Sequence, residues 1–276
     1  MFPPEHADNA GKTKGIDEKV NKIYKINMND ETGLGTELSR TERKRGERKA
    51  KILDAALALC AEHGLGAMTV QKLADSLDYT AGALYRYFRS KDALVAELEA
   101  RALEDIADRF RLVGEQWAQY EPFATAAKDE QHLFRILGLA QFYVDLLDTL
   151  PEQMHLIGML MGDRRSFVGD DDTARVAPVF TRMLGGVSDL FRAAQAAGAL
   201  AAGPPETRMV VFWSSLQGIA QIEKMQRFHS ELFDPRRRAP ELARALLLGW
   251  GANPNTLDRA ARLADDWRKS CSEHLQ

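Results

Sequence analysis

The chain has 276 residues, 45% hydrophobic and 28% charged, which is enough for a sizeable core in one or two domains. Its two cysteines, Cys60 and Cys271, are too few and too far apart for a disulfide framework or a cysteine metal site, so a reducing cytoplasm is expected. No apolar run reaches the ~20 residues of a membrane span, and the N-terminus lacks the hydrophobic core of a secretion signal, so we expect a cytoplasmic protein with no membrane partner.

The net charge of -3 is unevenly distributed along the chain. Residues 40–91 contain 11 Lys or Arg and 6 Asp or Glu, whereas residues 92–276 contain 21 and 27. A basic module on an acidic body is typical of a protein that binds a polyanion through one domain. A surface that is uneven by chance is the alternative.

Residues 1–39 are polar and lack a sustained hydrophobic period, which predicts a disordered N-terminal extension. The chain is then expected to divide into this extension, a basic helical domain over residues 40–92 and a larger, acidic helical domain over residues 93–276.

The 40–92 segment predicts short helices. The glycines of "EHGLG" end a first helix, and Thr69 and Thr80 are predicted N-caps of the next two. The helix after Thr80 lies in "TAGALYRYF", where Leu84 and Phe88 are spaced to point inward. The predicted apolar faces of the first two helices are Ile52, Ala56, Leu59 and His63, and Val70, Leu73, Ala74 and Leu77.

Two short helices joined by a tight turn and supported by a third predict a helix-turn-helix. In such a unit the second helix enters the major groove, and small residues at its start allow a close approach to phosphates. Packed helix pairs of similar spacing without DNA affinity are the alternative.

The rest of the chain also has helical periodicity, and no β-hairpin signal competes with it. Ser90 is a predicted N-cap for a helix with the apolar stripe Leu103, Ile106, Phe110 and Val113. Further helices are predicted after Pro122 to about Thr149, from Pro151 to near Gly162, from about Thr173 to Gly198, from Pro205 to about Phe228, from Pro240 to Trp250, and from Leu257 to about Ser270. "DRRSFVGDDD" is predicted as a loop and "DPRRRAPE" as a basic turn. The fold class is therefore all-α.

Residues 48–94 carry "ILDAA", "HG" after the first helix, "TVQKLA", "GALYRYF" and "SKDAL". In this combination the segment resembles the DNA-binding domain of TetR-family transcriptional regulators. The resemblance implies a three-helix head with a helix-turn-helix and a larger helical body that holds a ligand pocket and a two-fold dimer interface.

The resemblance also implies roles for individual residues. Thr69 is expected to cap a helix and contact a phosphate, and Gln71 to contact a base. Tyr85, Tyr87 and Lys91 are expected to contact phosphates; a capping or solvated role is the alternative for each. The implied DNA-binding residues are Arg48, Thr69, Gln71, Thr80, Ala81, Gly82, Ala83, Tyr85, Arg86, Tyr87 and Lys91.

The turn departs from the Gly-Val-Ser that is common in the family, since it reads Asp78-Tyr79-Thr80. Aspartate tolerates a left-handed backbone better than most residues, so the turn is expected to survive. Ala81 stands where a polar residue often follows the cap. Alanine reaches only a thymine methyl or the backbone, so Gln71, Arg86 and phosphate contacts are expected to carry more of the binding.

Two apolar helices near the C-terminus are expected to be buried, either within the chain or between subunits. We interpret them as half of a four-helix dimer bundle, with ordinary packing inside one chain as the alternative. The expected interface residues are Met209, Phe212, Trp213, Leu216, Ala220, Ala243, Leu246, Leu247 and Trp250.

Candidate ligand contacts are aromatic and Met residues with a few polar partners, for each of which a plain core role is the alternative. They are Phe134, Phe142, Tyr143, Met154, His155, Met159, Phe180, Met183, Trp213 and Gln217. His132 and His155 do not stand at metal-ligand spacing, so no metal site and no cofactor are expected.

These features favour a ligand-responsive homodimer that binds a palindromic DNA operator as a repressor and is released by a small molecule. A helical enzyme with a small apolar substrate and a DNA-independent interaction module are the alternatives. No Ser/His/Asp, Cys/His, metal or phosphate-loop arrangement supports an enzyme, so no catalytic residue is expected. The effector, the operator and the sign of regulation stay open.

Overall fold

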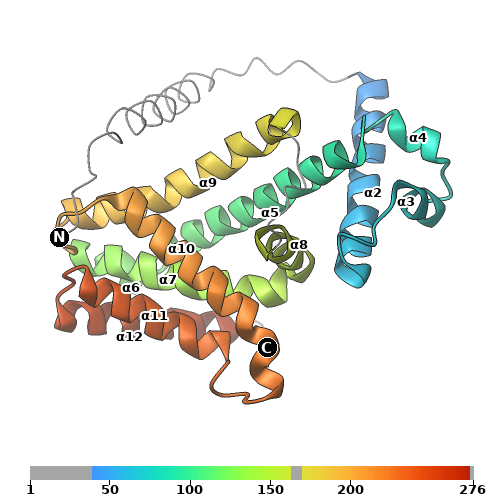
Figure 1. Cartoon of the computed structure of the whole chain (residues 1–276). Coiled ribbons are helices and arrows are strands. Elements are labelled where there is room, and N and C mark those ends of the chain that lie inside the picture. The colour runs from blue at the N-terminus through green and yellow to red at the C-terminus, as the bar shows by residue number, and fades with distance from the viewer. Residues whose placement is uncertain (1–38, 163–169, 274–276) are drawn as a thin grey trace, which may run out of the picture. The chain divides into compact units, whose positions relative to one another are not determined.

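The computed structural model describes residues 39–162 and 170–273. Every regular element in these ranges is a helix (Figure 1), which confirms the all-α class. The elements are α2 (Arg40–His63), α3 (Val70–Ser76), α4 (Ala81–Tyr85), α5 (Lys91–Gln119), α6 (Glu121–Thr125), α7 (Lys128–Thr149), α8 (Pro151–Gly162), α9 (Asp170–Ala196), α10 (Pro205–Ile222), the 3₁₀ helix η1 (Glu223–Arg227), α11 (Pro235–Gly249) and α12 (Pro254–Glu273). Apart from Ser39, the predicted N-terminal extension lies outside the described residues.

The helices of the head, α2 to α4, begin where the sequence predicts caps. Thr69, Thr80 and Ser90 each accept a hydrogen bond from the backbone N–H three residues later, at the starts of α3, α4 and α5. Such a bond satisfies one of the amide groups that a helix start leaves without a partner. The three predicted N-caps are confirmed.

The turn between α3 and α4 depends on Asp78. Its φ of 55° makes it the one non-glycine residue of the described chain with a positive φ. Aspartate adopts this left-handed conformation more readily than most residues, so α4 can leave α3 at a sharp angle without a glycine. The prediction that the turn survives with Asp78 is confirmed.

The core of the head is formed by α2, α3, α4 and the start of α5. Ile52, Leu73 and Leu84 are at most 2% exposed, and Phe88 is 5% exposed. The predicted inward positions of Leu84 and Phe88 are therefore confirmed. The predicted face of α2 is partly wrong, since His63 is exposed and Leu59 only half-buried, while Leu53, Leu57 and Cys60 are buried.

The body is built around α7, which packs against α8, α9, α10, α11 and α12. Figure 1 shows α5 (green) and α9 (yellow) running side by side, and these two helices pack along their length. No helix within the described ranges is both long enough and apolar enough to cross a bilayer. The apolar faces of these long helices together form the large core of the body.

Some predicted helix boundaries are wrong. α11 begins at Pro235, where a basic turn is predicted, because Asp234 caps it by accepting from the N–H of Arg236 at 3.0 Å. Proline at the first helical position needs no amide partner, so Asp-Pro starts this helix well before Pro240. Similarly, α9 begins at Asp170 rather than near Thr173, and α12 at Pro254 rather than Leu257. The segment predicted as helix to Phe228 ends as α10 at Ile222 and continues as η1.

Candidate DNA-binding surface and ligand cavity

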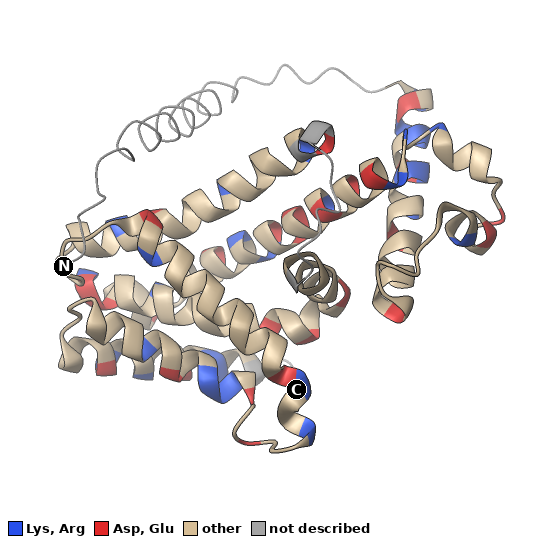
Figure 2. Ribbon diagram, in the orientation of Figure 1, with Lys and Arg blue, Asp and Glu red and all other residues tan. Residues whose placement is uncertain are grey.

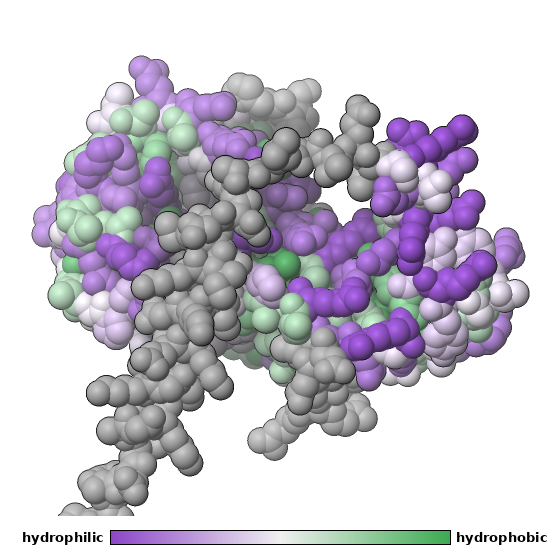
Figure 3. Space-filling view, turned by 90° about the horizontal axis from the view of Figure 1, so that it is seen from above, coloured by the Kyte–Doolittle hydropathy of each residue, from purple (hydrophilic) through white to green (hydrophobic). Residues whose placement is uncertain are grey.

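The exposed face of the head is produced by the way α4 is anchored. Leu84 and Phe88 are buried against the core of the head, so the neighbouring residues of "GALYRYF" turn outward. Tyr85 is 54% exposed as a result. Several Lys and Arg residues lie on α2, whereas α4 carries no charged residue (Figure 2). Hydrophilic side chains also cover the part of the molecule that holds the head (Figure 3).

Most of the predicted DNA-binding residues are accessible. Arg48, Thr69, Gln71, Thr80, Gly82, Tyr85 and Arg86 are exposed, and Ala81, Ala83, Tyr87 and Lys91 are half-buried. A Cβ on Gly82 would meet only the hydroxyl of Thr80, at 4.0 Å, so the start of α4 is open. This surface presents backbone and small side chains at the helix start, with longer polar side chains around it.

Three of these side chains have contacts within the chain. Gln71 Nε2 donates to Asp75 Oδ1 at 2.7 Å, one turn later on α3. Lys91 Nζ lies 3.5 Å from the carbonyl oxygen of Leu65, and the ring of Tyr87 packs on the core of the head. Gln71 must therefore exchange a partner before it can read a base, whereas Lys91 is held near the start of α5.

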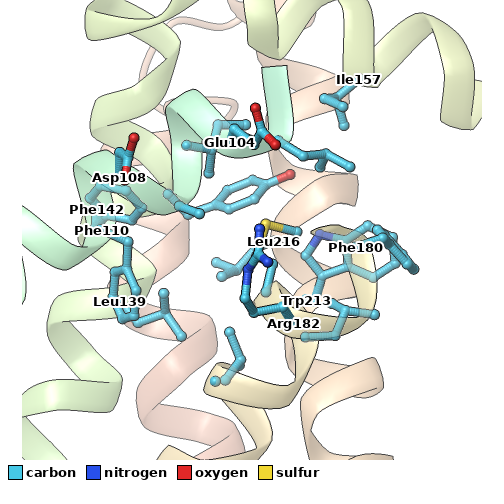
Figure 4. A pocket seen from close by; sticks show the side chains of 18 of the residues that line it. Glu104, Asp108, Phe110, Leu139, Phe142, Ile157, Phe180, Arg182, Trp213 and Leu216 are labelled. Atoms are coloured by element: carbon cyan, nitrogen blue, oxygen red, sulfur yellow. The ribbon is translucent and has the colours of Figure 1, made fainter. Parts of the chain in front are cut away.

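The body encloses a cavity of about 510 Å³ between α5, α7, α8, α9 and α10 (Figure 4). Most of its wall is apolar, and the rings of Phe180 and Trp213 meet edge to face at 6.0 Å. A cavity of this size with such a wall suits a small, largely apolar molecule. Its apolar lining is Leu103, Ile106, Ala107, Phe110, Leu139, Phe142, Met154, Ile157, Met161, Phe180, Met183, Leu184, Val187, Phe212, Trp213 and Leu216.

The cavity also has a few polar groups. The hydroxyl of Tyr143 donates to Gln217 Oε1, and burial raises the pKa of the Tyr143 phenol, which keeps it neutral. Burial likewise raises the pKa of the Glu99 carboxyl. Glu104 from α5 and Arg182 from α9 are exposed charged residues of the wall (Figure 4). Thus the hydroxyl of Tyr143 and the indole N–H of Trp213 are hydrogen-bonding groups in a mostly apolar wall, with charges where the wall is exposed to solvent.

A smaller cavity of about 180 Å³ lies behind Phe142, whose side chain lines both spaces. Trp117, Phe134 and Asp145 are among its lining residues. Trp117 is 2% exposed and its Nε1 has no hydrogen-bond partner within the described chain. The ring of Phe142 lies 5.2 Å, between centroids, from the ring of Phe110, which lines the large cavity.

The head matches a family of known regulators. The model for bacterial regulatory proteins of the tetR family matches residues 52–98. Two curated relatives are HTH-type transcriptional repressors. KstR2 of Rhodococcus jostii is 39% identical over 64 residues, which are 23% of this chain and 31% of the relative. KstR of Mycobacterium tuberculosis is 27% identical over 172 residues, 56% of this chain and 75% of the relative.

The head is therefore similar to the DNA-binding domain of the tetR family of bacterial regulatory proteins. The alignment with the first of these relatives covers about a third of that protein. Solved structures extend the likeness of the fold to the body. FadR of Bacillus halodurans matches with a TM-score of 0.54 at 16% identity, over 72% of this chain and 97% of FadR. FadR of Bacillus subtilis, determined with stearoyl-CoA, matches with 0.53 at 15% identity, over 70% and 96%.

Six of the ten predicted ligand contacts line the large cavity of the body: Phe142, Tyr143, Met154, Phe180, Met183 and Trp213. The other four do not. Phe134 is a core residue beside the smaller cavity, Gln217 is buried behind Tyr143, Met159 packs on the core of the head, and His155 is exposed. These four were grouped by residue type, which does not tell which helix face is turned to a cavity.

Sequence reasoning missed other residues of the cavity wall. Leu103, Ile106 and Phe110 of α5 form the wall opposite α9 and α10. Their spacing is visible in the sequence as an apolar stripe, but a stripe at helical spacing is more often core. Among the described residues, no group of three or more His, Cys, Asp or Glu side chains is placed to hold a metal ion.

The predicted dimer face is largely wrong. Met209, Phe212, Leu216, Ala243 and Leu247 are at most 6% exposed and belong to the chain's own core. The remaining members, Trp213, Ala220, Leu246 and Trp250, are half-buried. α10 is apolar on both sides. Its stripe of Met209, Phe212 and Leu216 faces the core, and the apolar residues Val210 and Val211 face solvent. The exposed apolar side chains of α10 and α11 are Val210, Val211, Ile222 and Leu248.

Proposed function

We propose that this protein is a TetR-family, ligand-responsive repressor that binds a palindromic operator as a homodimer in the cytoplasm and is not an enzyme. The observation that carries the proposal is the capped helix-turn-helix, with Leu84 and Phe88 buried and Tyr85 exposed on the short α4. A head of this construction places the start of α4 in the major groove.

DNA contacts in this proposal combine phosphate and base recognition. Tyr85, Arg86 and Lys91 hold phosphates, while Gln71 and the first residues of α4 approach base edges. Ala81 and Ala83 have no long side chain to read bases, so much of the affinity comes from the backbone. Binding should therefore fall steeply as salt rises, because phosphate contacts release counterions.

The dimer in this proposal uses the outward face of α10 and α11. Val210 and Val211 are 50% and 40% exposed, and Leu248 is 37% exposed. Adjacent apolar side chains on two neighbouring helices are typical of a buried protein interface. A two-fold axis through this face would give two heads that read the two halves of a palindrome.

The effector in this proposal occupies the 510 Å³ cavity. The wall favours a largely apolar molecule with a polar group that reaches the Tyr143 hydroxyl. FadR of Bacillus subtilis was determined with stearoyl-CoA and a Saccharomonospora viridis regulator with choline, so this fold accommodates ligands of different chemistry. A ligand that prefers one head arrangement shifts the protein toward it by its differential affinity.

Titration of the purified protein onto the intergenic DNA upstream of its own gene tests the proposal. A sequence-specific, salt-sensitive complex containing two chains is expected. A protein that binds this DNA no better than unrelated DNA would contradict it. Mass spectrometry of small molecules that co-purify with the protein would identify the effector.

A further inference from the structure

The first turns of α9 carry two charged residues that pair with the head and with α5. Oδ1 of Asp172 lies 2.9 Å from Nη2 of Arg89, the residue that directly follows Phe88. Arg175 forms an ion pair with Glu97 of α5, whose other carboxylate oxygen lies 2.8 Å from Nζ of Lys49 on α2. The start of α9 is thus connected to Arg89 and, through Glu97, to Lys49 on α2.

The Asp172–Arg89 pair is asymmetric in its burial. Asp172 is 4% exposed, whereas the Arg89 side chain is 57% exposed. Separating the two would leave a buried carboxylate without this cationic partner, which is strongly unfavourable. Arg89 and the head are therefore expected to follow Asp172 when α9 moves, rather than detach from it.

The same helix forms a wall of the ligand cavity. Phe180 and Met183 line the cavity and lie eight and eleven residues after Asp172, which is about 12–17 Å along a helix. Between Asp172 and Phe180, the side chains of Val176 and Val179 pack with Leu103 and further residues of α5 and α8 in one small cluster. Close-packed side chains transmit a displacement instead of absorbing it.

We propose that Asp172 and Arg175 are positioning residues through which α9 holds the head in its DNA-binding orientation and reports occupation of the cavity. This inference rests on the proposed function, since it assumes that the head binds an operator and that the cavity binds an effector. A molecule that pushes Phe180 or Met183 outward displaces α9, and the ion pairs pass this displacement to the head.

A tethered group of known size can replace the unidentified effector. Met183→Cys in a Cys271→Ser background offers one accessible thiol, because Cys60 is 0% exposed. Benzyl methanethiosulfonate then forms a mixed disulfide with this thiol, releases methanesulfinate and places a benzylthio group in the cavity. Dithiothreitol reduces the disulfide and removes the group. Operator affinity is measured by fluorescence anisotropy on the upstream DNA before this modification, after it, and after reduction.

The benzylthio modification is expected to weaken operator binding about tenfold or more in the protein with Asp172, and by less than about threefold after Asp172→Asn, within the usual range of coupling between sites. Arg175→Gln should also make the loss of operator affinity on modification smaller. It serves as the second variant if D172N does not fold. Asp258→Asn is the matched control, because it breaks an ion pair of 2.6 Å between α12 and α11. It should leave the tenfold effect intact.

An equal effect of the modification with and without Asp172, or no effect in either protein, would overturn the inference. A D172N protein that unfolds at the wild-type temperature and has lost operator binding before the modification supports the positioning role. If the unmodified wild-type protein binds no upstream DNA, the proposed function itself has failed, which is a separate result.

Discussion

The indole ring of Trp117 on α5 lies directly against the backbone of Gly138 on α7. A Cβ at position 138 would come within 2.5 Å of Cζ2 of the ring. The ring has little freedom to move, because it is 2% exposed and meets the rings of Phe134 and Trp267 at 5.5 and 5.9 Å. Gly138→Ala should therefore force a shift in the core and lower the free energy of unfolding by about 1–3 kcal/mol.

Thermal and urea unfolding would measure this change. Gly114→Ala, in the helix that carries Trp117, is the matched control, because a Cβ there meets nothing within 4 Å. That variant should be neutral or gain about 0.5–1 kcal/mol from its higher helix propensity. Equal stability of the two variants would contradict the close Trp117–Gly138 contact.

Tyr85→Phe tests the DNA-binding surface without disturbing the core. The side chain is 54% exposed, so removal of its hydroxyl should leave the unfolding temperature unchanged. Because the operator complex contains two chains, two phosphate hydrogen bonds of about 0.5–1.5 kcal/mol each are lost, which should weaken operator binding roughly 5–150-fold. Because a phosphate contact carries no sequence information, binding to unrelated DNA should weaken by a similar factor. Anisotropy titrations on both DNAs measure the two affinities. Unchanged affinity would show that the Tyr85 hydroxyl does not contact DNA.

Ile106→Trp tests the large cavity. Ile106 lines the cavity from α5, so a tryptophan there should fill part of the 510 Å³. Binding of the neutral fluorescent probe N-phenyl-1-naphthylamine should weaken about tenfold or more, which corresponds to about 1.4 kcal/mol. Leu112→Trp on the same helix is the control, since Leu112 is 45% exposed and outside the wall. Equal probe affinity in the two variants would place the probe elsewhere.

Val211→Arg tests the outward face of α10. In the proposed dimer, Val211 is buried against a second chain, and a charge there would lose its water without gaining a partner. The dissociation constant of the dimer should therefore be at least about tenfold higher than that of the wild type. Sedimentation velocity measures the assembly state, and Leu112→Arg controls for a new surface charge on α5. A V211R protein that remains dimeric over the same range would exclude this face.

The buried thiol of Cys60 predicts how the stability of the fold depends on pH. Burial raises the pKa of its thiol from the ordinary 9.0 to about 11. As the pH rises above 9, the unfolded chain releases this proton first, so stability should fall between pH 9 and 11. At pH 8 in the folded protein, a disulfide reagent such as 5,5′-dithiobis(2-nitrobenzoate) should modify Cys271 and spare Cys60. Two reactive thiols before unfolding would show that Cys60 is accessible.

Much of the head could be predicted from the sequence, because its determinants are local; the exception is α2, where His63 and Leu59 of the predicted face are not buried. Thr69, Thr80 and Ser90 cap the next helix through contacts three residues away, and Asp78 sets its own turn. Each of these signals is readable without knowing the rest of the fold. The head's accessible residues follow from the same local pattern.

The body was less predictable because its contacts are between distant segments. α10 is apolar on both faces, so its period could not decide whether Phe212 or Val211 faces the core. Likewise His155 and Met154 are neighbours in sequence, yet only Met154 reaches the cavity. The side of a helix that is buried depends on helices that lie far away in the chain.

The central claim is that the capped helix-turn-helix recognises DNA, and a salt series of operator titrations tests it most directly. Fluorescence anisotropy would give the dissociation constant of wild-type protein for its upstream DNA and for a scrambled duplex between 50 and 200 mM salt, a range over which about 6–10 phosphate contacts would weaken binding by about 10³–10⁵. We expect tighter binding to the upstream DNA at every salt concentration, with two chains per site and a steep loss of affinity as salt rises. Equal affinity for both duplexes, or affinity that does not change with salt, would contradict the account.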